Sequence, residues 1–181
     1  MKFPKELTTK QYLYLAETSS DIATAIFHTA NGSYKSAKIL IRSSIENYFK
    51  AFCQDELPNI LTEKSVFKIF ESVKALLYFQ KENQKECYNL IHHTYVELCK
   101  DTHTADVINM ENITALKYFP SYDAKKFEEV NKMLSKLIKC FIFLLCDKYN
   151  KQFHDMHYKN KENIIRAINK KLRPVIQGAD E

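Results

Sequence analysis

Three of the six histidines in this chain lie close together, in the stretch NLIHHTYVELCKDTHTAD at residues 89–106. A cysteine, a lysine and two acidic residues lie between the first and the last of them. Imidazole binds metal ions and also transfers protons at neutral pH. The stretch therefore raises three possibilities: a metal site, a catalytic site, or the ordinary face of a helix.

A metal ion shared by the whole cluster is not expected. If the stretch is helical, His92 and His103 are about 16 Å apart along the axis and cannot reach one ion. Residues four positions apart can do so, but each pair supplies only two of the three or four protein ligands that zinc takes. His154 and His157 lie further along the chain, and nothing in the sequence requires them to complete a site. We therefore expect neither a metal ion nor another cofactor.

The same stretch has the groups that metal-independent RNA cleavage needs. A histidine transfers the proton, and a nearby cation stabilises the negative charge of the transition state. Lys100 precedes His103 by three residues where the predicted helix ends, and His93 is the other candidate base. The alternative is that these side chains only face solvent, and the sequence does not decide between the two.

The composition excludes several classes of function. The chain has two glycines, Gly32 and Gly178, which leaves no Gly-rich loop to hold the phosphates of a nucleotide. Its five cysteines have no C-x-x-C spacing, so we expect reduced thiols and a cytoplasmic protein. No secretion signal is apparent at the N-terminus. The longest apolar run, residues 137–146, is about half of the roughly 20 residues that a membrane span needs. We therefore expect no contact with a membrane.

The hydrophobic pattern predicts an all-α protein. Apolar residues recur every three or four positions, which is the spacing of a helix with one face in the core. The pattern predicts one domain over residues 1–181, a bundle of five to six helices with a long loop before residue 123. The predicted helices cover residues 10–30, 34–53, 83–103, 125–153 and 161–172, and a further one starts at Thr62 or Ser65 and reaches residue 79.

Positive charge is concentrated in the C-terminal flank, residues 147–173. This flank contains eight Lys or Arg and three acidic residues, so it accounts for the net charge of +5 of the whole chain. Such a flank favours an anionic partner, either a nucleic acid or an acidic protein surface. A solvated lysine-rich helix is the alternative. The candidate binding residues are Lys159, Lys161, Arg166, Lys170, Lys171 and Arg173.

The second predicted helix carries a pattern of the form A-x-x-L-x-R-x-x-x-E-x-x-x-K-A. The matching positions are Ala37, Leu40, Arg42, Glu46, Lys50 and Ala51. Together with the histidine-containing stretch that follows, residues 34–106 resemble the HEPN superfamily. This is an all-α superfamily that is common in bacterial abortive-infection, toxin–antitoxin and CRISPR-linked proteins. The resemblance implies a HEPN-like bundle in a defence system, with Arg42 and Glu46 as site residues beside a histidine.

One feature of active HEPN ribonucleases is missing. They carry an arginine four to six residues before a histidine, often as R-N-x-x-x-H, and no arginine here precedes a histidine at that spacing. Lysine does not readily replace the planar fork with which arginine holds a phosphate. The resemblance therefore implies the fold more than the activity.

Three functions follow as hypotheses. The first is a non-catalytic HEPN-like subunit that forms a homodimer or joins a larger defence complex, with RNA or DNA as a further partner. The second is a metal-independent endoribonuclease that uses His103 or His93 with Lys100 and Arg42. The third is a helical adaptor unrelated to HEPN proteins. Arg42 and Glu46 are four residues apart and can pair on their helix, and the resemblance favours an inward-facing pair that reaches towards His103.

Overall fold

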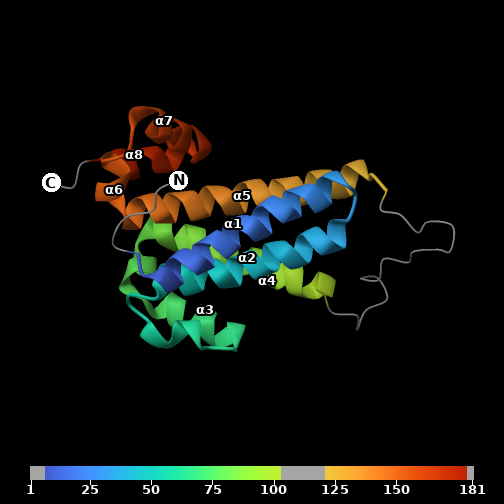
Figure 1. The fold of residues 1–181 in the computed structure, drawn as a ribbon, viewed down its shortest axis with the longest axis horizontal. Helices are drawn as coiled ribbons and strands as arrows, with labels where there is room; N and C mark the ends of the chain where they lie inside the picture. The colour runs from blue at the N-terminus through green and yellow to red at the C-terminus, as the bar shows by residue number, and fades with distance from the viewer. Residues whose placement is uncertain (1–6, 103–120, 179–181) are drawn as a thin grey trace.

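The computed structural model describes residues 7–102 and 121–178, and these residues are helical with no β-strand among them. Four long helices lie side by side as a bundle, and Figure 1 shows that their axes are roughly aligned. They are α1 (Thr9–Ala30), α2 (Tyr34–Cys53), α4 (Glu82–Thr102) and α5 (Ala124–Lys148). The predicted all-α class is confirmed.

Shorter helices connect the long ones and extend the C-terminal end. They are η1 (Pro58–Leu61), α3 (Val66–Ala75), η2 (Leu77–Gln80), α6 (Asn150–His154), α7 (Tyr158–Ala167), η4 (Lys170–Leu172) and α8 (Arg173–Gln177). The described residues thus contain eight α-helices, and the expected five to six were too few. The bounds of α1 and α2 and the start of α4 lie within one residue of the prediction, α5 ends earlier than predicted, and the extra helices are all short.

Local sequence signals explain how the first two helices begin and end. Thr8 forms a capping box with Gln11, in which each side chain accepts a hydrogen bond from the other residue's backbone N–H, at 3.2 and 2.9 Å. At the turn after α1, Gly32 has a φ of +75°, which other residues rarely adopt. A Cβ atom at Gly32 would lie 2.5 Å from the carbonyl oxygen of Ser121, so only glycine fits where this turn meets the start of α5.

The core forms around α2, which lies between the other long helices. Ile41, Ile45 and Phe49 on one face of α2 are completely buried. Tyr48 stacks on Phe141 of α5 with the ring centroids 3.9 Å apart, and its hydroxyl donates to the Phe141 carbonyl at 3.0 Å. Burial of these side chains supplies the main driving force for bringing α2 and α5 together.

The C-terminal part departs from the sequence prediction. The helix expected over residues 125–153 ends at Lys148, and Tyr149 takes a non-helical conformation before α6 begins. This break lets Phe153 turn into the core, where it is 2% exposed. The helix expected over residues 161–172 is also divided, because α7 ends at Ala167 and η4 covers Lys170–Leu172. Next comes α8, with Pro174 in its first turn. Proline is tolerated there, since the first turn of a helix needs no backbone donor.

The predicted long loop, and His103 with it, lies outside the described residues. Within residues 7–102 and 121–178, no helix combines the length and the hydrophobicity that crossing a membrane requires. The cytoplasmic location stays a prediction.

Candidate functional site

The structure brings Arg42 and Glu46 together, as predicted, and adds a tyrosine that the sequence prediction missed. Arg42 donates from Nε and Nη2 to the hydroxyl of Tyr95 on α4, at 3.1 and 2.8 Å. Tyr95 in turn donates to Glu46 Oε1 at 3.0 Å, and Arg42 Nη2 lies 3.2 Å from the same oxygen. The three side chains form a closed triangle that ties α2 to α4.

The surroundings of Arg42 and Tyr95 keep both groups protonated. Burial alone would lower the pKa of Arg42, but its bonds to Tyr95 and Cys99 and the charge of Glu46 raise it instead. Burial raises the pKa of Tyr95, and the negative charge of Glu46 raises it further, although Arg42 opposes both. Arg42 is therefore a cation, and Tyr95 keeps its proton at neutral pH, so that its hydroxyl can donate a hydrogen bond to Glu46.

The remaining described candidates, Lys100 and His93, lie on another face of α4. At 100° per residue they are about 140–160° around the helix axis from Tyr95. Both are exposed, and Lys100 pairs with Glu97 at 2.7 Å. The hydrogen bond from Lys100 lowers the pKa of Glu97, and the charges of Lys100 and His93 lower it further. The structure thus separates Lys100 and His93 from Arg42 and Glu46.

The histidine next to His93 belongs to an aromatic cluster. The ring of His92 lies 4.8 Å from Phe70 and 5.9 Å from Tyr88, measured between centroids. Tyr88 is buried, and its hydroxyl donates to the Phe70 carbonyl at 2.9 Å. Tyr88 therefore serves to hold α3 against α4. In the parts of the chain that the structure describes, no three His, Cys, Asp or Glu side chains are grouped so as to hold a metal ion.

The C-terminal helices α6, α7 and α8 form a pocket within the basic flank. Its volume is about 540 Å³, and it opens to solvent. The lining residues are Phe153, His154, Tyr158, Lys161, Glu162, Ile165, Arg166 and Gln177. Two of the six predicted binding residues, Lys161 and Arg166, are among them. Aromatic and cationic groups thus share one concave surface, and the sequence signal for it was the charge of the flank.

Lys161 and Arg166 of the pocket also have partners in the protein. Lys161 donates to the carbonyl of His154 at 2.9 Å, which caps the end of α6. Arg166 pairs with Glu162 at 2.6 Å, but its side chain is 72% exposed, so the pair is held only weakly.

The other four predicted binding residues lie outside the pocket lining. Arg173 donates to the carbonyl oxygens of Ile168 and Arg166 and so closes the end of α7. Lys171 pairs with Glu86 of α4 at 3.0 Å. Lys159 and Lys170 are exposed.

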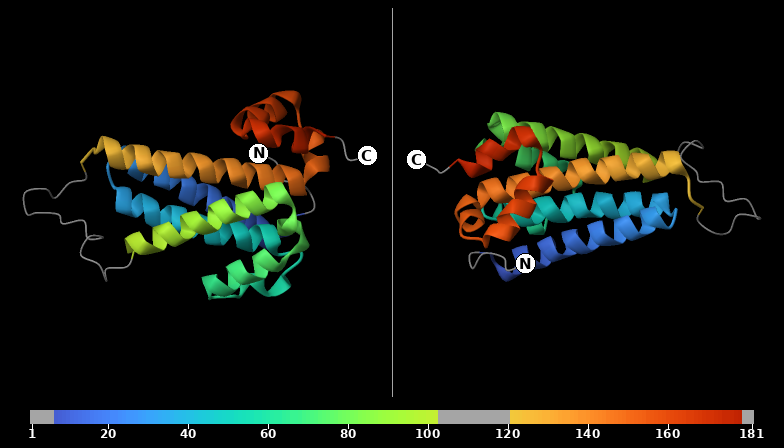
Figure 2. Two further views of the ribbon diagram at one scale, coloured as in Figure 1. Left: turned by 180° about the vertical axis from the view of Figure 1, so that it is seen from behind. Right: turned by 90° about the horizontal axis from the view of Figure 1, so that it is seen from above.

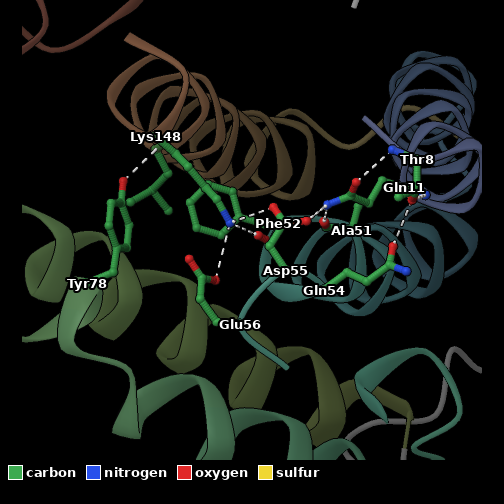
Figure 3. Close-up of polar contacts among 10 residues, drawn as sticks. Thr8, Gln11, Ala51, Phe52, Gln54, Asp55, Glu56, Tyr78 and Lys148 are labelled. Carbon is green, nitrogen blue, oxygen red and sulfur yellow. Dashed lines mark hydrogen bonds and ion pairs between the residues drawn. The ribbon is translucent and has the colours of Figure 1, made fainter. Parts of the chain in front are cut away.

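Lys148 was counted in the same basic flank but has a structural role. Its side chain is 13% exposed and points at the end of α2 (Figure 3), where Nζ donates to the Phe52 carbonyl at 2.6 Å. The same nitrogen lies 3.2 Å from Glu56 and 3.4 Å from Asp55, and 4.8 Å from the centre of the Phe52 ring. Lys148 therefore neutralises two acids and satisfies a carbonyl at a helix end.

Comparison of this chain with models of protein families, with curated proteins and with solved structures gives no match. The similarity to HEPN proteins therefore rests on the sequence pattern alone.

Proposed function

We propose that this protein is a non-catalytic helical subunit whose C-terminal helices bind single-stranded nucleic acid. The observation that carries the proposal is the pocket between α6, α7 and α8. It combines the cations Lys161 and Arg166 with the rings of His154 and Tyr158. The HEPN-like origin and the role in a bacterial defence system are part of the same proposal, and they rest on the sequence pattern.

These are the groups with which proteins bind single strands without reading a sequence. Bases stack on aromatic side chains, and lysine or arginine neutralises the phosphates between them. Tyr158 is 63% exposed, so its ring is accessible, and the ring of His157 lies 4.6 Å from it. Lys159, the next residue, is exposed. A short single strand thus has both a stacking surface and phosphate contacts.

The geometry around Arg42 supports a non-catalytic role. Its guanidinium group donates twice to Tyr95 and pairs with Glu46, so it is used in holding α2 against α4. His93 and Lys100 lie on a different face of α4, which gives no common site for the three groups. The ribonuclease hypothesis then depends on His103.

Binding is tested by fluorescence anisotropy with a labelled oligouridine of about 15 nucleotides. We expect Tyr158→Ala and the double variant Lys161→Ala/Arg166→Ala each to weaken binding by about tenfold, and the double variant to reduce the salt dependence by about two released ions. Glu162→Gln removes the negative charge beside Arg166, and binding should become a few times tighter. Lys132→Ala is the matched control, since Lys132 forms an exposed pair with Glu128 on α5 at the same four-residue spacing.

Two results would contradict the proposal. One is that the wild-type protein does not bind the oligonucleotide at low salt, or that all the pocket variants bind it as well as the wild type does. The other is cleavage of RNA in EDTA that is lost in His103→Ala or His93→Ala, because such cleavage would establish the ribonuclease. RNA that remains intact with folded wild-type protein agrees with a non-catalytic subunit.

A further inference from the structure

The outward face of α1 is apolar although it faces solvent. Tyr12, Leu13, Ile26 and Phe27 are 48%, 60%, 49% and 64% exposed. The view from above in Figure 2 shows α1 at one edge of the bundle, with α2 beside it. Large apolar side chains that gather on one exposed face commonly mark a surface that binds another protein.

This face also carries no charge. It covers about 160° of the helix surface at 100° per residue, from Ile26 round to Thr24. The charged residues of α1 lie elsewhere: Lys10 and Glu17 flank the face, and Asp21 is buried and accepts a hydrogen bond from Asn47 at 3.1 Å. A second copy of a chain with a net charge of +5 can therefore approach here without like charges opposing each other.

The middle of the face is formed by small residues. Ala16, Ser19, Ser20 and Ala23 are all exposed and separate the large side chains at the two ends. Ser19 donates its hydroxyl proton to the Leu15 carbonyl at 3.0 Å, so this donor keeps its partner when water is removed. Small side chains at the centre let two helix backbones approach closely, while the ends have room for larger groups.

The order of large and small residues reads the same in both directions about the point between Ser19 and Ser20. We propose that two copies of this chain form a dimer in which their α1 helices pack antiparallel about that point. Tyr12 then lies near the partner's Ile26, and Leu13 lies near the partner's Phe27. Ala16 faces the partner's Ala23, and the serines lie at the two-fold axis. A surface that is complementary to itself in this way is what a closed two-fold dimer requires.

The area available indicates a weak dimer. A helix of 22 residues is about 33 Å long and 10–12 Å wide, so half of its surface is roughly 500–600 Å². Two copies together bury about 1,100 Å², close to the lower limit of about 1,200 Å² for standard interfaces. Dimerisation should therefore depend on concentration in the micromolar range or above. This inference does not depend on the nucleic-acid pocket, because it concerns another helix.

Sedimentation equilibrium of the full chain over a range of concentrations tests the dimer and its register. Ala16→Glu and Ala23→Lys each place an unpaired charge against an alanine of the partner twice per dimer, and each should weaken dimerisation by at least about tenfold. Mixing the two variants should restore a dimer, because the introduced glutamate of one chain then faces the introduced lysine of the other.

Ser135→Glu, an exposed position on α5, is the matched control and should leave the dimer intact. Circular dichroism verifies that each variant remains helical, as glutamate and lysine are good helix formers. A wild-type chain that remains monomeric at all concentrations would overturn the proposal. So would a dimer that neither single substitution weakens, or two variants that do not associate when mixed.

Discussion

Lys148 and Arg166 carry the same charge and belong to the same stretch of sequence, but the fold uses them differently. Lys148 is 13% exposed and has four contacts at the end of α2: the Phe52 carbonyl, the Phe52 ring, Asp55 and Glu56. Arg166 is 72% exposed and pairs with one acid on its own helix. The first is needed to hold α5 against α2, and the second is available to a ligand.

The comparison shows that a count of charges does not define a binding surface. Residues 147–173 carry a formal charge of +5, but Lys148 is offset by two acids in the turn after α2, and Lys171 is paired with Glu86. What remains for a partner is the smaller set around α7. If this distinction is correct, substitutions at buried polar contacts should change stability, and substitutions around the pocket should change binding.

The largest effect on stability is expected for Lys148→Met. The substitution keeps most of the side-chain volume but leaves the Phe52 carbonyl and two carboxylates without their cation. We expect the free energy of unfolding to fall by about 2–3 kcal/mol, as for a buried charged hydrogen bond. Urea denaturation measures it. Lys151→Met on α6 is the control, and this exposed residue should change the stability by less than about 0.5 kcal/mol. Equal effects of the two substitutions would remove the distinction between structural and available cations.

A smaller loss is expected for Tyr95→Phe. The variant removes the hydroxyl through which Tyr95 of α4 binds Arg42 and Glu46 of α2, but Arg42 and Glu46 remain paired with each other. The loss should be about 1 kcal/mol in urea denaturation. Tyr122→Phe, at a tyrosine that is 67% exposed, should change the stability little. A Tyr95→Phe variant as stable as the wild type would mean that the triangle does not hold these helices together.

The smallest effect concerns pH. Burial against the aromatic cluster lowers the pKa of His92, and the charges of Lys74 and His93 lower it further. Since the pKa is lower in the folded state, stability is complete above the ordinary histidine value and decreases as the pH falls through it. Between about pH 7 and pH 5, His92→Gln should lose less stability than the wild type. The difference should be a few tenths of a kcal/mol, because His92 is exposed.

Asn89→Gln on the same helix introduces no titrating group and should keep the pH profile of the wild type. A profile of His92→Gln that matches the wild type would show that another group titrates.

The sequence predicted the long helices well because their signals are local. The Thr8 capping box, the turn at Gly32 and the cap at Asp123 fix where α1 and α5 begin or end, and each depends on a few neighbouring residues. The Arg42–Glu46 pair was also predictable from spacing. Tyr95 was not, because the prediction looked for a histidine and the partner lies 49 residues away from Glu46 in the sequence.

The sequence by itself thus determined the helical class and the position of the excess positive charge. Only the tertiary structure decided which charges are neutralised, where α5 breaks at Tyr149, and that Arg42 is held by Tyr95 and not next to His93. Periodicity and capping depend on residues a few positions apart, whereas neutralisation and burial depend on which faces of distant helices meet.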